Sequence, residues 1–253
     1  MIQSLRLFFK QGRQYIGNLF TAQVDKKYRG FPQFKPNLCT HCSKCMTNCP
    51  VNAISEDLTV DIGKCQFCGE CIKNCPTQAA AFSNFHHTGA TDRETLKIAP
   101  GTTPEDYKKS AIEVKREIMK MFGRSLKLRS VSAGGCNGCE LELNATGNVN
   151  FDLGRYGIDI AASPRHADGI IISGPISRNM AAALQSTYDA VPDPKIVVLL
   201  GSCAISGGVF ADSDELDRSF LEENKIDLYI PGCPPHPLTI ANAILDFIGR
   251  SKR

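Results

Sequence analysis

The side chains with the clearest chemistry in this 253-residue sequence are its twelve cysteines. Eight of them form two runs of one pattern, Cys-x2-Cys-x2-Cys-x3-Cys-Pro, and the second run repeats the first after 26 positions. The first run holds Cys39, Cys42, Cys45 and Cys49, and the second holds Cys65, Cys68, Cys71 and Cys75. Three thiolates on one tight loop can bind three irons of a cube, while the turns aim backbone N–H groups at the sulfurs. Zinc also binds Cys-x2-Cys pairs, but it has no need of a third cysteine followed twice by Cys-Pro.

The two runs have the spacing of the two-cluster bacterial ferredoxins, in which the fourth cysteine of each run binds the cluster of the other run. The spacing therefore predicts two 4Fe-4S clusters with crossed ligand sets. One cluster takes Cys39, Cys42, Cys45 and Cys75, and the other takes Cys65, Cys68, Cys71 and Cys49. Residues 31–85 are expected to form this α+β ferredoxin-like two-cluster domain.

The four remaining cysteines lie in three glycine-rich segments, GGCNGCELE, GSCAISGG and PGCPPHP. They are Cys136, Cys139, Cys203 and Cys233, and each segment follows a short apolar run with the character of a strand. Five such runs, at 126–134, 156–164, 167–175, 195–202 and 227–232, are accompanied by helical patterns at 177–191 and 237–253. Residues 126–253 are therefore expected to form an α/β domain with a flavodoxin-like open parallel sheet.

Loops that follow parallel strands converge on one edge of the sheet, so four thiols distant in sequence can meet there. The neighbouring glycines would let the backbone approach a bulky cofactor closely, although glycines are also ordinary in turns. By spacing alone, the four thiols fit either a third 4Fe-4S cluster or a structural zinc ion.

The three glycine-rich segments resemble the cysteine loops of the nickel–iron hydrogenase small subunit and of the related complex I subunit that holds the terminal cluster. The resemblance covers about residues 125–245. In the complex I branch the first two cysteines are adjacent, whereas Asn137 and Gly138 separate them here, as in the hydrogenase branch. The N-terminal third, with YRGFPQF, resembles the two-cluster ferredoxin subunit of complex I and of group 4, formate-hydrogenlyase-like hydrogenases. Both parts in one chain depart from the usual arrangement of separate subunits.

The resemblance implies a third 4Fe-4S cluster on Cys136, Cys139, Cys203 and Cys233, and hence three clusters in all. No cysteine pairs then remain for a nickel–iron site, so that site is expected on a partner large subunit. The chain would be the electron-transfer subunit of a hydrogenase, an oxidoreductase, working with further electron-transfer and membrane subunits. Two alternatives remain open: a complex I-like quinone or carrier module without nickel, and a ferredoxin-type carrier whose α/β domain holds zinc.

Two acidic residues follow Cys139 and are candidates for proton exchange beside the partner's active site. Glu142 matches the acid of the family pattern better than Glu140, and partial burial near a cluster should raise its pKa. An acid in a first helical turn can instead simply complement the helix dipole. His236 is expected to cap a helix or to pack rather than to contact a cluster.

Composition fits a globular protein, since 42% of residues are hydrophobic, 22% are charged and the net charge is +3. These values argue against disorder, a membrane-embedded chain or a nucleic-acid binder. Two compact units are expected, each with its own core, joined by a linker with one helix at 86–125. Residues 1–30 are expected to hold an amphipathic basic helix, over 2–22, that docks on a partner or on an anionic membrane. No spanning segment or secretion signal is recognisable, so we expect a cytoplasmic protein, peripheral on the cytoplasmic face of the membrane.

Overall fold

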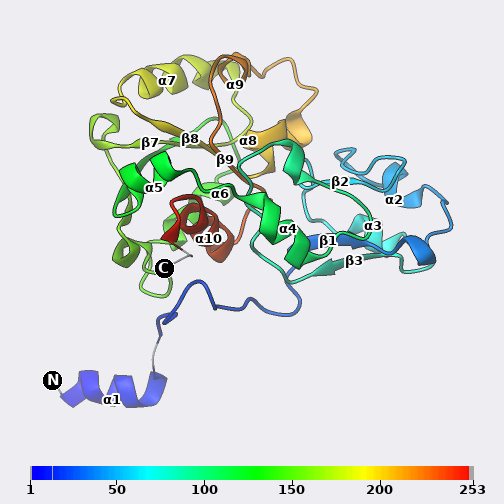
Figure 1. The fold of residues 1–253 in the computed structure, drawn as a ribbon, viewed down its shortest axis with the longest axis horizontal. Coiled ribbons are helices and arrows are strands. Elements are labelled where there is room, and N and C mark those ends of the chain that lie inside the picture. Colours follow the sequence, from blue (N-terminus) through cyan, green and yellow to red (C-terminus); the bar gives the residue numbers. More distant parts are fainter. Residues whose placement is uncertain (1, 13, 251–253) are drawn as a thin grey trace.

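The cysteine-rich part of the computed structural model, which describes residues 2–12 and 14–250, reproduces the repeat of the sequence. Each run carries a one-turn helix, α2 (Lys44–Thr47) in the first and α3 (Glu70–Lys73) in the second. Two small antiparallel sheets accompany them: β1 (Phe31–Phe34) with β3 (Ala80–Ser83), and β2 (Val60–Asp61) with β4 (Lys97–Ile98). This part lies on one side of the molecule and the α/β part on the other (Figure 1).

The α/β part is built on a five-stranded parallel sheet. Its strands are β5 (Leu126–Ser132), β6 (Ile158–Ile160), β7 (Gly169–Ser173), β8 (Ile196–Leu200) and β9 (Leu228–Ile230). All five fall within the runs predicted as strands. The strand order β6-β5-β7-β8-β9 is the flavodoxin-like order 2-1-3-4-5, which confirms the predicted architecture.

Helices cover both faces of this sheet (Figure 1). The helices are α6 (Gly138–Ala145), α7 (Arg178–Asp189), α8 (Ser202–Ser206), α9 (Ser219–Glu223) and α10 (Pro237–Phe247). Successive strand residues point to opposite faces, so Ile170 and Ile172 enter one hydrophobic core and Ile171 enters the other. Helix α7 matches its predicted segment. Helix α10 begins where predicted but ends at Phe247, before the end of the predicted segment, and residues 251–253 of that segment lie outside the described part of the chain.

One of the two cores is shared between the cysteine-rich part and the α/β part. Phe31 and Ile62 from the first belong to the same buried cluster as Val131 and Ile172 from the second. The expectation of two units, each with its own core, is therefore corrected. The cysteine-rich part therefore buries part of its apolar surface against one face of the sheet.

The segment expected as a linker, 86–125, is packed onto the α/β part. Ala90 forms an antiparallel bridge with Tyr229 of the edge strand β9, with N···O distances of 2.9 and 2.8 Å. The expected single helix is two helices, α4 (Pro104–Ala111) and α5 (Arg116–Phe122). The break begins at Ile112, which is extended and precedes a hydrogen bond from Glu113 N to Thr91 Oγ1 (3.1 Å). The segment thus covers a sheet edge that would otherwise be open.

The N-terminal helix α1 (Ile2–Gln11) is shorter than the predicted helix over 2–22. It ends at Gly12, which has a φ of +67° and donates to Phe8 O (2.8 Å). The apolar residues beyond it serve tertiary packing, because Leu19 is fully buried in the core beneath α10. Helix α1 extends away from the rest of the molecule (Figure 1). Among the described residues, no helix is both long enough and apolar enough to cross a bilayer.

Candidate metal centres

The twelve cysteines gather around three cavities, and each cavity is lined by one of the predicted ligand sets. We call them the outer set, the inner set and the third set. The outer set is Cys39, Cys42, Cys45 and Cys75. The inner set is Cys49, Cys65, Cys68 and Cys71. The third set is Cys136, Cys139, Cys203 and Cys233. The fold therefore brings together the residues that sequence spacing and family resemblance had grouped, including the crossed fourth cysteine of each run.

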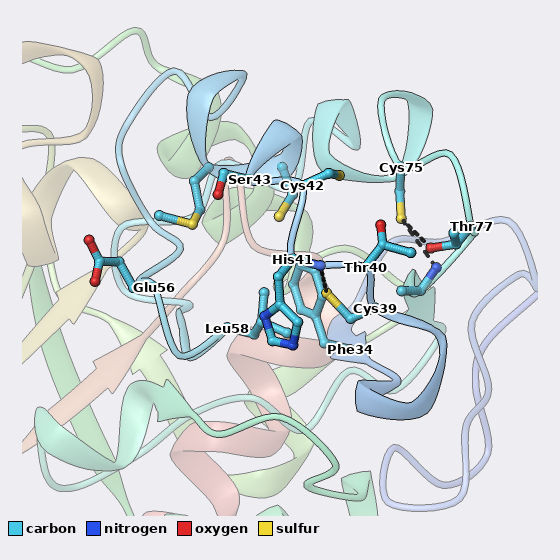
Figure 2. A pocket seen from close by; sticks show the side chains of 13 residues that line it. Phe34, Cys39, Thr40, His41, Cys42, Ser43, Glu56, Leu58, Cys75 and Thr77 are labelled. Carbon is cyan, nitrogen blue, oxygen red and sulfur yellow. Dashed lines mark hydrogen bonds between the residues drawn. The ribbon is translucent and has the colours of Figure 1, made fainter.

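The outer and inner sets are shaped by the same backbone turns. Peptide N–H groups point at sulfur in both: His41 N lies 3.4 Å from Cys39 Sγ, and Phe67 N lies 3.3 Å from Cys65 Sγ. The fourth cysteines show the same symmetry, since Ala53 N and Ala79 N donate to Cys49 Sγ and Cys75 Sγ, each at 3.2 Å. Figure 2 shows Cys75 reaching from the second run toward the loop of the first. Such donors stabilise negatively charged sulfur, as a cluster requires.

Left-handed backbone conformations produce these turns. His41 and Phe67 have φ values of 51° and 54°, and the residues two positions later, Ser43 and Gly69, have 56° and 82°. Non-glycine residues seldom adopt positive φ, and here three do so at matched places in the two runs. Such conformations persist only where the surrounding structure stabilises them, and they concentrate at functional sites. The second run uses glycine where the first uses serine, and the turn is the same.

The third set lies at the carboxyl edge of the parallel sheet, where the sequence places it. Cys136 and Cys139 follow β5, Cys203 lies in α8 after β8, and Cys233 follows β9. Gly174, which follows β7, also lines the cavity. Strands β5 and β7 flank the point at which the strand order reverses, so the site occupies the switch point of the fold.

Two glycines leave the room that the third set needs. A Cβ atom at Gly201 would clash with Cys139 Sγ, and one at Gly208 would lie 2.8 Å from Cys203 Sγ. Both glycines also have positive φ, of +87° and +59°. At both positions the absence of a side chain leaves room for a cysteine sulfur close to the backbone, as expected for glycines beside a bulky cofactor.

The electrostatics of the sites fit a positively charged metal group. Burial, followed by repulsion from neighbouring thiols, raises the pKa of Cys65 and of Cys139 to about 12. The same causes raise the pKa of Cys71 and of Cys203 to about 11. Four thiolates this close need compensating cations, and iron bound to sulfur supplies them. Within residues 2–12 and 14–250, no three His, Cys, Asp or Glu side chains converge as ligands of a single ion would.

The inner set lies next to the third set. Ser202, the residue before Cys203, donates its hydroxyl to Cys65 O at 2.7 Å. Cys68 also acts electrostatically on Cys233, where it adds to the burial that raises the pKa of that thiol. The cavity at the outer set is the largest of the three, at ≈ 270 Å³ against ≈ 20 Å³ at each of the others. The three sets thus run from the third, through the inner, to the outer.

The two candidate acids occupy different places. Glu140 lines the third cavity and accepts a hydrogen bond from Ser173 Oγ (2.7 Å). Burial acts to raise the pKa of Glu140, but hydrogen bonds from Ser132 and Ser173 outweigh it and the pKa is lowered. Glu142 does not line the cavity, and burial raises its pKa, in the direction expected for a proton-exchanging group.

His236 has the capping role expected from sequence. Its Nδ1 accepts a hydrogen bond from Leu238 N (3.1 Å) at the start of α10. From sequence, no role was assigned to two residues near the third set: Ser202, which bridges two sets, and Arg218, whose guanidinium donates to carbonyls of α8. Ser202 lies within the GSCAISGG segment and Arg218 lies outside the three segments, but in both cases the partners are backbone carbonyls that only the fold reveals.

Comparison with known proteins gives matches in both parts of the chain. Residues 136–247 match the family "NADH ubiquinone oxidoreductase, 20 Kd subunit", and residues 31–54 and 58–80 each match a 4Fe-4S binding domain. A "probable membrane-bound hydrogenase subunit mbhJ" of Pyrococcus furiosus is 34% identical over 129 residues, 51% of this chain and 77% of that protein. An NADH-quinone oxidoreductase subunit of Heliobacterium modesticaldum is 36% identical over 156 residues, 61% of this chain and 88% of that protein.

The chain belongs to the nickel–iron hydrogenase small-subunit and complex I 20 kDa-subunit family. Within this family, formate hydrogenlyase subunit 7 of Escherichia coli is 39% identical over 134 residues, which are 53% of this chain and about half (52%) of that protein. A chain of an archaeal membrane-bound sulfane sulfur reductase complex is also similar, with 32% identity over 53% of this chain and 73% of that one, at a TM-score of 0.42. The 4Fe-4S matches make this family member an iron–sulfur protein, and its relatives are subunits of larger complexes.

Proposed function

We propose that this chain is the electron-transfer subunit of a nickel–iron hydrogenase complex and that it carries electrons through three 4Fe-4S clusters. Residues 31–85 and 126–253 act as its cluster-bearing units. The observation that carries the proposal is the arrangement of twelve cysteines in three neighbouring sets of four, one set at each cavity.

The third set is the end that faces the catalytic partner. Cys136 and Cys233 are exposed, so a cluster held there lies at the surface. Apolar side chains flank them: Leu141, Val209 and Phe210 are 61%, 56% and 45% exposed. A partner subunit would cover these side chains and bring its own active site close to the third set. Because the three sets use every cysteine, a nickel–iron site with cysteine ligands belongs to that partner.

The outer set is the end that faces an external donor or acceptor. Cys42 is exposed and the cavity beside it is open, so a small electron carrier can approach this set closely. When bound, 4Fe-4S clusters supply reversible one-electron steps. The chain's own residues fix the order of the clusters, exclude water from the inner set and stabilise the sulfur charge with backbone N–H groups.

The spacing of the first two cysteines of the third set favours a hydrogenase over a complex I-like module. Cys136 and Cys139 are separated by two residues, as in the hydrogenase branch, and Cys139 lies inside helix α6. Among similar proteins, membrane-bound hydrogenase and formate hydrogenlyase subunits support the same choice. We place the complex on the cytoplasmic face of a membrane, held there by integral-membrane partners.

Hydrogen-driven reduction of the purified complex tests the function. We expect nickel to co-purify and hydrogen gas to reduce all three clusters, followed by electron paramagnetic resonance (EPR). In a Cys203→Ser variant, hydrogen should no longer reduce the inner and outer clusters, although dithionite still does. A complex that lacks nickel and is reduced by a quinol but not by hydrogen would establish the complex I-like alternative. The similarity to an NADH-quinone oxidoreductase subunit keeps that alternative in view.

A further inference from the structure

Arg218 places a positive charge beside α8, the helix that carries Cys203 of the third set. It precedes α9, and its guanidinium donates four hydrogen bonds to backbone carbonyl oxygens. Nη1 donates to Pro175 O (2.9 Å) and Cys203 O (3.2 Å), and Nη2 donates to Ala204 O (2.8 Å) and Ile205 O (3.1 Å). Three of these carbonyls belong to α8, the five-residue helix that carries Cys203. These hydrogen bonds therefore hold the guanidinium against the helix that carries a residue of the third set.

The charge of Arg218 has no acidic partner among the residues that the structure describes. Arg93 offers the contrast, because its guanidinium forms two hydrogen bonds with the Asp61 carboxylate, at 2.6 and 2.9 Å. Carbonyl dipoles satisfy the donors of Arg218 but leave its net charge in place, and a partly buried charge without a counterion is costly. Burial lowers the pKa of Arg218, and the Cys203 sulfur acts in the opposite sense. The negative charge that can balance Arg218 is thus that of the cysteine thiolates in the third set.

We propose that Arg218 is a positioning and charge-tuning residue that raises the reduction potential of the cluster held by the third set. The inference rests on the proposed third cluster. Reduction adds one electron to an already anionic group, with no proton transfer, so a nearby fixed cation stabilises the reduced form more than the oxidised form. The arginines beside the inner set differ from Arg218. Arg93, beside Gly63, is neutralised by Asp61, and Arg29 is exposed to solvent and donates a single hydrogen bond, to Cys68 O at 2.6 Å.

The test is a potentiometric EPR titration of the purified complex carrying Arg218→Gln, which removes the charge but keeps a hydrogen-bond donor. The third-cluster signal is assigned by its loss in Cys136→Ser. We expect the equilibrium constant for reduction of that cluster to fall about tenfold, a shift of about 59 mV to more negative potential. Arg218→Lys retains the charge with fewer hydrogen bonds and should keep the wild-type potential. Arg178→Gln, which removes an exposed charge from α7, should change nothing.

The outcomes separate charge from structure. An unshifted potential in Arg218→Gln, or equal shifts in the Gln and Lys variants, would overturn the proposal. Arg218 would then have only a structural role, through its hydrogen bonds to α8. If Arg218→Gln fails to hold the cluster, Arg218→Lys decides: a cluster at the wild-type potential supports the proposal, and a lost or shifted one overturns it. A wild-type complex with no third-cluster signal would remove the proposed cluster itself, and the inference with it.

Discussion

In the cysteine-rich part, three thiols of each set come from one short loop, and only the fourth arrives from the other run. In the third set, four thiols come from three loops at the edge of a sheet, and no loop supplies more than two. The first arrangement is nearly local, with its own backbone N–H groups aimed at sulfur. The third set depends instead on the correct alignment of the parallel strands, because these strands place its three loops at one edge of the sheet. The third set should therefore be the more sensitive to changes elsewhere in the chain.

Matched cysteine variants should have the largest effects. Cys203→Ser removes a ligand of the third set, so hydrogen-driven reduction of every other cluster should stop, while about eight of about twelve irons remain. Cys42→Ser removes a ligand of the outer set, so hydrogen should still reduce the remaining clusters, but transfer to an external acceptor should stop. EPR and iron analysis of both variants provide the measurement. If Cys42→Ser also abolished reduction of the inner cluster, the order third, inner, outer would be wrong.

Substitution of a glycine separates crowding from backbone strain. Gly201→Ala places a Cβ against Cys139 Sγ at a φ of +87°, whereas Gly101→Ala has a similar φ of +84° and open space around it. Strain alone should cost Gly101→Ala about 1–2 kcal/mol. Gly201→Ala should cost more and should also lose the third cluster. The check is the free energy of unfolding together with iron content. Equal losses in both variants would show that the space beside Cys139 is not required.

Ile205 tests whether the two parts fold as one. It is 6% exposed in the shared core, and a Cβ at Gly63 would lie 2.9 Å from its Cγ2. Ile205→Ala should lower the free energy of unfolding by about 2–5 kcal/mol. Val209→Ala, at a 56% exposed position, should change it by about 0.5 kcal/mol or less. Denaturant unfolding followed by cluster absorbance and by circular dichroism should give one transition. Two separate transitions would restore the picture of independent domains.

The local arrangement was the easier to predict from sequence, for physical reasons. Three cysteines on one loop can bind three irons of one cluster, and the spacing of the two runs is that of the two-cluster bacterial ferredoxins, whose ligand sets are crossed. The third set needed the five apolar runs as well, because only a parallel sheet brings Cys136 and Cys233 to one edge. Its grouping was predictable once those strands were recognised.

Tertiary packing was not predictable in the same way. Leu19 lies in a stretch with helical spacing, yet it is buried in the core as part of an irregular segment. Ala90 sits in a polar stretch that resembles a linker, yet its backbone completes the edge of the sheet. In both cases contacts with residues distant in sequence determine the backbone conformation, and the local pattern of apolar residues does not indicate those contacts. Arg218 was missed for the same reason, since its partners are backbone carbonyls.

The smallest expected effect concerns pH and the junction between the parts. His86 is 7% exposed, and burial, followed by the charge of His87, lowers its pKa to about 4 from an ordinary 6.5. The unfolded chain therefore binds this proton more readily, so stability is present above about pH 6.5 and is lost as pH falls toward 4. Between pH 7 and pH 5 this group should lower the free energy of unfolding by about 2 kcal/mol, and His86→Gln should abolish that contribution. Urea midpoints at pH 7 and pH 5 measure it, with the exposed His166→Gln as control. An unchanged pH dependence in His86→Gln would show that other groups are responsible.

The metal content of the purified full chain tests the central claim most directly. Three sets of four cysteines predict about twelve irons and a similar amount of acid-labile sulfide per chain, with no zinc. About eight irons with one zinc would contradict the account, because Cys136, Cys139, Cys203 and Cys233 would then surround a single structural ion.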